Sequence, residues 1–332
     1  MLEWPDPPAA SDMKTLLAFV IAFTISTAHA KTCAQPGPAG ERGARLAELA
    51  MAEYRIFNGH RLDAQGRLWK FGSVEVETEP LRGEEQQQSG DRVAWRRVWR
   101  YWQTLDQHSP GTLDLRQMAW SEYLLDDPAH AGKLRLSTLR ELLASVPADN
   151  EAAREALVRA TISDTPWSAA FISFLMDQAG FSESEFHFSA GHAIYIRPAL
   201  EEAPGYAYRA CDVRTTVPRT GDLICYGRAA KPLTTFAEWK AQASHLDSRV
   251  KSHCDLVVKV DRAAAKLESM GGNVEQSVTW RKLMLDENGH LSQRHRVARQ
   301  PTGPNARECA SDDSCTKSDM NQQHWAILLQ LR

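Results

Sequence analysis

The chain has 332 residues, of which 43% are hydrophobic and 24% are charged, and its formal net charge is −3 at pH 7. This profile is that of an ordinary globular protein, with enough apolar residues for one large domain or two small ones. The charge balance gives no broad basic surface, so we expect no nucleic acid as a partner.

The N-terminal segment predicts export. Residues 13–30, "MKTLLAFVIAFTISTAHA", place a lysine before an apolar run from Leu16 to Ile25, with the small residues Ala28 and Ala30 at the end. This is the layout of a secretory signal peptide cut after Ala30, preceded by a short extension. The alternative is a buried N-terminal helix. No other segment is long and apolar enough for a stable membrane span, so we expect a soluble periplasmic or secreted protein.

Export makes the six cysteines candidates for disulfide bonds. Cys309 and Cys315 lie close together in a polar loop, and this is the bridge that we expect first. Cys225 and Cys254 lie in apolar strand patterns, where they fit a buried thiol as well as a bridge. Spacing alone does not decide the pairing of the six.

The first half of the chain is predicted to be mainly helical. Residues 41–57 and 92–105 carry apolar residues at helical spacing, and further helices are expected near 112–125 and 134–145. One short strand is expected at 72–79, where apolar and polar residues alternate.

The helix predicted over residues 92–105 has an aromatic stripe with arginines on the opposite face. The stripe consists of Trp95, Val98, Trp99, Trp102 and Leu105. Apolar stripes at helical spacing are usually core, so we expect this face to pack inside the protein. The alternative is a groove for a glycan or a peptide.

Two more helices are expected before the pattern changes. The first has Asp149 or Asn150 as its cap. The second covers residues 166–179, with Pro166 at its first position and Gly180 just past its end.

Beyond Gly180 the pattern predicts strands. They cover residues 221–228, 253–262, 273–285 and 324–332, and another precedes the glycine pair of "MGGN". Helices followed by strands predict an α+β fold, with an antiparallel sheet packed against helices and a helical N-terminal portion.

The expected organisation follows from this order of elements. Residues 1–30 form the extension and signal peptide, residues 31–145 the helical N-terminal portion, and residues 146–332 an α+β domain of catalytic type. The last two parts are expected to form one continuous fold.

Side chains alternate along a strand, so His253 and Asp255 share one face of their strand. The opposite face, with Cys254 and Leu256, has a core pattern. Asn273 directly follows the glycine pair that ends the next strand, where the chain can turn tightly or approach another backbone closely.

Ser168 lies in the first turn of the helix predicted over residues 166–179. Backbone N–H groups are free there and the helix dipole is positive, which favours an anionic nucleophile or oxyanion. A histidine such as His253 can take the proton of the hydroxyl, while Asn273 or Asp255 orients the ring. Each residue also has an ordinary explanation, as a helix start, a strand-edge histidine or a turn residue.

Several motifs resemble one bacterial family, the domain of unknown function DUF2272. They are "PWSAAFISFLM", "GDLICYGR", "SHCDLVVKV" and "GGNVEQSVT", with "AEYRIFNG" and "WRRVWRYW" upstream. The resemblance runs from about Ala44 to the C-terminus. More distantly, the central motifs are similar to NlpC-type and CHAP amidases and peptidases of cell-wall turnover, which implies a papain-like fold.

The distant resemblance implies roles for particular residues. Ser168 takes the place of the nucleophilic cysteine, His253 that of the base and Asn273 that of the orienting residue. Trp167 and Asp222 match residues beside the substrate, although a turn or structural role is the stronger expectation for Asp222. The implied activity is amide hydrolysis of cell-wall peptides, with a cell-wall peptide or glycan as partner and no cofactor.

The serine departs from the pattern of those enzymes. A cysteine is partly thiolate at neutral pH, whereas a serine hydroxyl depends wholly on its base and oxyanion donors. Ser168 is therefore compatible with a serine-type hydrolase, with an inactive module that binds peptide or glycan, or with an acyltransferase or secreted effector. Cys254 and Cys225 are poorly aimed to replace it.

A second histidine, His192 in "SAGHAIYI", is a further candidate for lining the site. The remaining alternative is a zinc site formed by His192, His253 and Asp255. The sequence lacks the tight spacing of ligands that such sites usually have, so no metal is expected.

Overall fold

The computed structural model of the chain describes residues 33, 40–77, 93–121, 134–163, 165–296 and 319–332. The predicted signal peptide and the expected Cys309–Cys315 bridge lie outside the described residues. Among the described residues, no helix has the length and apolarity needed to cross a membrane.

The main sheet of the described residues has eight strands. Neighbouring strands run antiparallel, except that β1 and β9 are parallel. In spatial order the strands are β2 (Leu68–Lys70), β1 (His60–Leu62), β9 (Ser277–Met284), β8 (Lys266–Val274), β7 (Ser252–Asp261), β6 (Leu223–Gly227), β10 (Trp325–Leu331) and β5 (Tyr208–Asp212). The fold is therefore a mixed α/β fold with an antiparallel-rich sheet, as the order of elements predicted.

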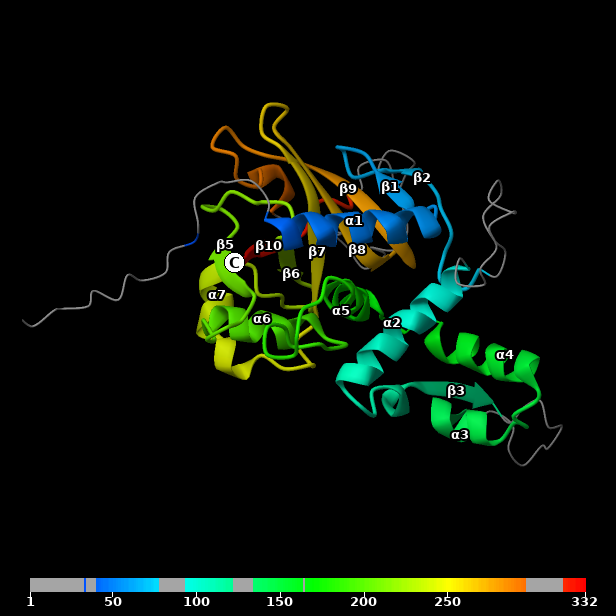
Figure 1. Ribbon diagram of the computed structural model, residues 1–332. Helices are drawn as coiled ribbons and strands as arrows, with labels where there is room; N and C mark the ends of the chain where they lie inside the picture. The colour runs from blue at the N-terminus through cyan, green and yellow to red at the C-terminus, as the bar shows by residue number, and fades with distance from the viewer. Residues whose placement is uncertain (1–32, 34–39, 78–92, 122–133, 164, 297–318) are drawn as a thin grey trace, which may run out of the picture. The chain divides into compact units, whose positions relative to one another are not determined.

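Helices α1 (Glu41–Ile56) and α5 (Ser168–Gln178) both contact β7 and β8, and α1 crosses the sheet in Figure 1. Helix α6 (His192–Leu200) contacts β5 and β7, and α7 (Phe236–Ala241) contacts β10. One apolar cluster joins these layers, with Leu46, Phe171, Cys254, Leu256 and Met270 among its buried members. The predicted core face of the 253–262 strand is thus confirmed.

Helices α2 (Ala94–His108), α3 (Leu139–Ala144) and α4 (Glu151–Ile162) form a second group, because α4 contacts both α2 and α3. Helix α2 also packs on α5, which links the group to the sheet (Figure 1). The aromatic stripe is confirmed as core, since four of its five residues are buried and only Trp99 is half-buried.

One arginine of α2 does not lie on an exposed face. Arg97 is buried and forms an ion pair with Glu53 of α1, and the Tyr101 hydroxyl donates to the same carboxylate at 2.6 Å. The burial of a charge requires such a partner, and this pair ties α2 to α1.

Three local predictions in the first half are wrong in whole or in part. The helix expected near 134–145 is a strand over residues 134–138 and a helix only from Leu139 to Ala144. The helix expected near 112–125 is a short 3-10 turn followed by strand β3 (Gln117–Ser121), which pairs with β4 (Leu134–Thr138). Pairing between strands overrides local helical spacing here. In the 72–79 segment, residues 72–77 form no strand. There Ser73 and Glu75 are buried, and their backbone N–H groups donate to the carbonyls of Phe57 and Gln276.

The predicted helix ends are largely confirmed. Asn150 caps α4 by accepting from the N–H of Ala153 at 3.1 Å. Gly180 adopts a φ of +77° just past α5, a conformation that glycine reaches without steric cost. Helix α5 begins at Ser168, two residues later than expected, and Trp167 is its N-cap.

The described residues of the N-terminal portion belong to the same compact unit as the rest, Cys33–Arg332. Strands β1 and β2 extend the main sheet beyond β9, so part of the sheet comes from residues well before position 146.

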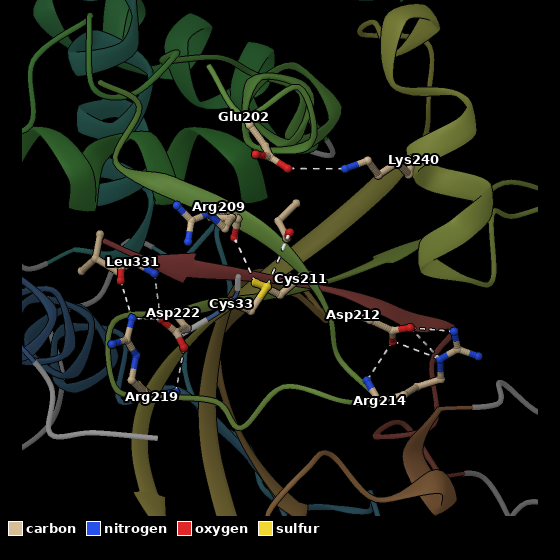
Figure 2. The surroundings of a disulfide bond; sticks show 11 residues. Cys33, Glu202, Arg209, Cys211, Asp212, Arg214, Arg219, Asp222, Lys240 and Leu331 are labelled. Carbon is tan, nitrogen blue, oxygen red and sulfur yellow. Dashed lines mark hydrogen bonds and ion pairs between the residues drawn. A yellow bond between two sulfur atoms is a disulfide. The ribbon is translucent and has the colours of Figure 1, made fainter. Parts of the chain in front are cut away.

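Two disulfides connect distant parts of the chain. Cys33 is bridged to Cys211 on β5 (Figure 2), and Cys225 on β6 is bridged to Cys254, its direct partner on β7. The expectation that Cys225 and Cys254 serve equally well as free thiols is therefore corrected, because strand pairing brings their Cα atoms to 4.1 Å.

Gly272 marks the closest approach of β8 to α5. A Cβ atom at this position would lie 2.6 Å from the Cβ of Phe171 and within 2.8 Å of its ring. We expect Gly272→Ala to lower the free energy of unfolding by about 1–3 kcal/mol, because the crowded core must shift. Urea unfolding measures the change, and Gly40→Ala, where no atom lies within 4 Å, is the control. Equal stability of the two variants would contradict this packing.

Candidate functional site: a buried serine, two histidines and an aspartate

Ser168 is the first residue of α5 and is 4% exposed. No side chain among the described residues caps the start of this helix. The first-turn N–H groups of a helix have no partner within it and carry the positive end of the dipole. The Ser168 hydroxyl therefore lies beside groups suited to stabilising negative charge.

The histidine that contacts Ser168 is His192. Its Nε2 lies 2.7 Å from the Ser168 Oγ, and its Nδ1 is hydrogen-bonded to the Tyr195 hydroxyl one turn later on α6. If the serine hydroxyl donates to Nε2, then Nδ1–H donates to the tyrosine. Burial, followed by the neighbouring His253 and Arg228, holds the pKa of His192 well below 6.5, so its ring is neutral and can accept a proton.

Tyr195 keeps its proton over the whole useful pH range. Burial, followed by the nearby Tyr206 and Tyr208, raises its pKa well above 10. A neutral phenol next to His192 Nδ1 can fix the ring orientation without adding charge.

His253 and Asp255 form a second pair on β7, as the alternation predicted. His253 Nε2 lies 2.9 Å from the Asp255 Oδ1, and both residues are buried. The other carboxylate oxygen accepts from Ser269 at 2.9 Å and pairs with Arg281 at 3.0 Å. The carboxylate is thus held by three partners.

The charges of this pair follow from its surroundings. Burial alone would raise the pKa of Asp255, but Arg281, His253 and Ser269 together lower it below its ordinary value, so the group is ionised. Burial outweighs the Asp255 hydrogen bond at His253 and lowers its pKa, so that ring is neutral. The Nδ1 of His253 is buried and has no hydrogen-bond partner among the described residues.

The two pairs are neighbours. The rings of His192 and His253 have centroids 5.1 Å apart, so four side chains follow one another in the order Ser168, His192, His253, Asp255. A Cβ atom at Gly271 would lie 2.3 Å from the Asp255 Oδ1, so this glycine makes room for the pair. Ser168 therefore contacts His192, and not His253 as the sequence had led us to expect. His192 lies between the serine and His253.

Asn273 does not take the orienting place. It is half-buried, adopts a left-handed φ of 54° in the irregular end of β8, and makes no hydrogen bond to His253 in the described structure. Asp255, the alternative considered from the sequence, holds that position.

Trp167 is core and does not border an open site. It is fully buried, its Nε1 donates to Glu75 at 2.5 Å, and its ring packs with Phe57 and Tyr101 at centroid distances of 5.7 and 5.6 Å. It fixes the start of α5 and thereby the position of Ser168.

Asp222 has the structural surroundings expected of the "GD" aspartate. It is buried and accepts from the backbone N–H groups of Arg219 at 2.7 Å and Leu331 at 2.9 Å (Figure 2). Burial raises its pKa to about 7, against the opposing effect of these N–H groups and the Arg219 side chain.

The raised pKa of Asp222 makes stability depend on pH. The folded state binds this proton more tightly than the unfolded state, so the contribution is present in acid and lost as the pH rises through about 7. From about pH 5 to about pH 8, we expect the free energy of unfolding to fall by about 2–3 kcal/mol more in the wild type than in Asp222→Asn. Urea titrations at both pH values measure this change. An equal change in the wild type and in Asp222→Asn would contradict the prediction.

The zinc alternative gains no support. In the part of the chain that the structure describes, no group of three or more His, Cys, Asp or Glu side chains is arranged to hold a metal ion. The geometry brings the two histidines together with a serine, a tyrosine and one carboxylate, which is a set for proton transfer.

Three residues of the site were missed from the sequence. Tyr195 lies three residues after His192 on α6, and Ser269 and Arg281 come from β8 and β9. Spacing to His192 could have signalled the tyrosine. The other two depend on the pairing of β7 with β8 and of β8 with β9, which the sequence does not specify.

These features define a mixed α/β protein with a buried serine–histidine site on a core helix. A family model, described as an uncharacterized protein conserved in bacteria (DUF2272), matches residues 140–331. The match covers more than half of the chain, which therefore belongs to this family. All the residues of the site fall inside the match, whereas the upstream motifs from about Ala44 fall outside it. No curated protein and no solved structure matches the chain.

Proposed function

We propose that this chain is an exported hydrolase with a papain-like fold, in which Ser168 replaces the usual cysteine and cuts amide bonds of cell-wall peptides. The observation that carries the proposal is the hydrogen bond between Ser168 Oγ and His192 Nε2 at the start of a core helix. The packing of that helix on an antiparallel-rich sheet, with a histidine strand beside it, supports the same class.

The proposed reaction uses His192 as the base. The Ser168 Oγ attacks the amide carbonyl carbon while its proton passes to His192 Nε2. The C–N bond then breaks, the same proton goes to the departing amine, and an acyl-serine remains. A water molecule, deprotonated by His192, releases the acid and restores the serine hydroxyl.

Charge stabilisation comes from two directions. The oxyanion lies toward the free N–H groups in the first turn of α5. Positive charge on His192 is costly in a buried site, and in this proposal the negative charge of Asp255, beyond His253, offsets part of that cost. His253 and Asp255 thus act in this scheme as positioning and electrostatic residues behind the Ser168–His192 pair.

A second candidate function is an inactive module on the same fold that binds cell-wall peptide or glycan. The burial of the site favours it, since Ser168 and His192 are each 4% exposed. In the hydrolase, the residues that cover Ser168 must move before a substrate reaches the Oγ. In the inactive module they stay closed, and the serine–histidine pair only stabilises the fold.

Export is part of the proposal. The predicted signal peptide motivates it, and the disulfides Cys33–Cys211 and Cys225–Cys254 support it, because such bonds persist in oxidising compartments. The expected location is the periplasm or the medium.

Purified protein starting at Lys31, incubated with peptidoglycan, tests the function. The hydrolase releases soluble fragments with new free amino groups, measured by amine labelling, and no new reducing sugar ends. Binding to peptidoglycan without new amino groups would favour the inactive module. The absence of both would contradict a role on the cell wall.

A further inference from the structure

A groove lined by α2, α4 and the end of α5 lies apart from the serine–histidine site. It has a volume of about 620 Å³. Ser168 begins α5, whereas Asp177 and Gln178, which line the groove, end it. At 1.5 Å per residue, the two sites are separated by about 15 Å along this helix.

One wall of the groove is a regular row on α2. Trp95, Trp99, Gln103 and Gln107 follow one another at intervals of four residues, which places them on one face of the helix. The row extends over about 18 Å of helix. A groove of this length suits a chain of several units better than a single small molecule.

Trp99 offers an aromatic face to the groove. Its side chain is half-buried, and no ring contact, cation contact or hydrogen bond to it occurs in the part of the chain that the structure describes. The Trp95 ring, in contrast, is buried and has Arg96 and Arg159 over it at 5.4 and 5.9 Å. The exposed amides of Gln103 and Gln107 continue the row beyond Trp99.

Contacts between the elements fix the walls. Arg96 of α2 pairs with Glu155 of α4 at 2.5 Å, and His108 at the end of α2 lies 2.8 Å from the Asp177 carboxylate. Arg154 donates to the Leu143 carbonyl at 2.9 Å, which ties α4 to the end of α3. A groove held in this way binds with little loss of conformational freedom.

We propose that this groove binds an oligosaccharide. A sugar ring has a face of C–H groups that packs on an indole, and hydroxyls that both donate and accept. The groove supplies both kinds of partner, since amides, guanidinium groups and carboxylates line it together with tryptophan rings. Its three arginines and two carboxylates leave a net charge of only +1, which does not select a polyanion.

A peptide fits the groove less well. Extended peptides add to a free sheet edge, and amphipathic helices need an apolar groove. Helices line this groove and most of its lining side chains are polar. The inference does not depend on hydrolysis at Ser168, because the two sites share no residue.

The test uses the Ser168→Ala protein, so that binding is measured without turnover. Isothermal titration with β-1,4-linked N-acetylglucosamine oligomers, with soluble glycan strands from peptidoglycan and with a cell-wall stem peptide compares the two ligand classes. We expect a saccharide to bind and the added change Trp99→Ala to weaken it about tenfold. Trp69→Ala, at a 55% exposed tryptophan of β2, is the matched control and leaves the affinity unchanged.

A second variant, Gln103→Ala/Gln107→Ala, alters only exposed side chains and guards against misfolding of the Trp99 variant. It too is expected to weaken saccharide binding. The inference is overturned by affinity for none of the saccharides, by affinity that both groove variants retain, or by binding of the stem peptide alone. Failure of hydrolysis with intact saccharide binding would affect only the proposed function.

Discussion

Ser168→Ala is expected to lower the rate of amide hydrolysis by a factor on the order of 10⁶, the loss that follows removal of a serine nucleophile. The reason is geometric: Oγ is the atom that lies 2.7 Å from His192 Nε2, at the start of α5. Amine release from peptidoglycan, compared between the variant and the wild type at equal protein concentration, measures the effect.

The matched control is Ser277→Ala. Ser277 is buried like Ser168 and donates to the Ser73 carbonyl at 2.7 Å, but it lies on β9 outside the site. The control variant should keep its activity. Full activity in Ser168→Ala would end the serine mechanism, and activity that appears only in Ser168→Cys would identify a site that has lost its nucleophile.

Asp255→Asn is expected to lower the free energy of unfolding by about 3–5 kcal/mol, because it leaves a buried charge without its partner. Asp255 is fully buried, and Arg281, which pairs with it at 3.0 Å, is also buried. The carbonyl oxygen of an asparagine can still accept hydrogen bonds, but the neutral amide cannot balance the charge of the guanidinium. Urea unfolding followed by circular dichroism measures the loss.

The double variant Asp255→Asn/Arg281→Met separates this explanation from simple loss of packing. Removal of both charges should recover much of the stability, although it does not restore the positioning of His253. The control is Asp247→Asn, the same change in a solvent-exposed pair with Arg249, which should leave the stability nearly unchanged. A double variant as unstable as the single one would contradict the charge argument.

Much of the second half of the fold was predicted from local pattern, although strand β5 and helix α6 were not. The alternation in 253–262 predicted that Cys254 and Leu256 face the core and that His253 and Asp255 lie together, and the structure has both. Such a strand is specified because a shift of one residue would expose its apolar face. Helix α5 (Ser168–Gln178) was equally clear from its end signals, Pro166 before it and Gly180 after it.

The first half of the fold was predicted less well, because the strand partners there are distant in sequence. Strands β3 and β4 pair with each other although twelve positions separate them, and β1 pairs with β9, more than 200 positions later. Neither partner is visible in a local window. Helical spacing was therefore the stronger local signal near 112–125, and it was wrong.

The sequence predicted most residues of the candidate site, but not which of them contact one another. Ser168, His253 and Asp255 were identified, but the residue between them, His192, was expected only to line the site. His192 is the first residue of α6, a helix that the sequence did not predict. The path of residues 181–191 brings it next to Ser168 at the start of α5. Contacts of this kind come from tertiary packing, which spacing does not reveal.

The most direct measurement of the central claim is the mass of the intact protein after reaction with a fluorophosphonate. In this reaction the Ser168 Oγ forms a bond to phosphorus, fluoride leaves, and the hydroxyl proton passes to His192. The account predicts one adduct per chain, mapped to Ser168, and its loss in His192→Phe. An unlabelled wild-type protein, or an adduct that forms equally in both proteins, would contradict it.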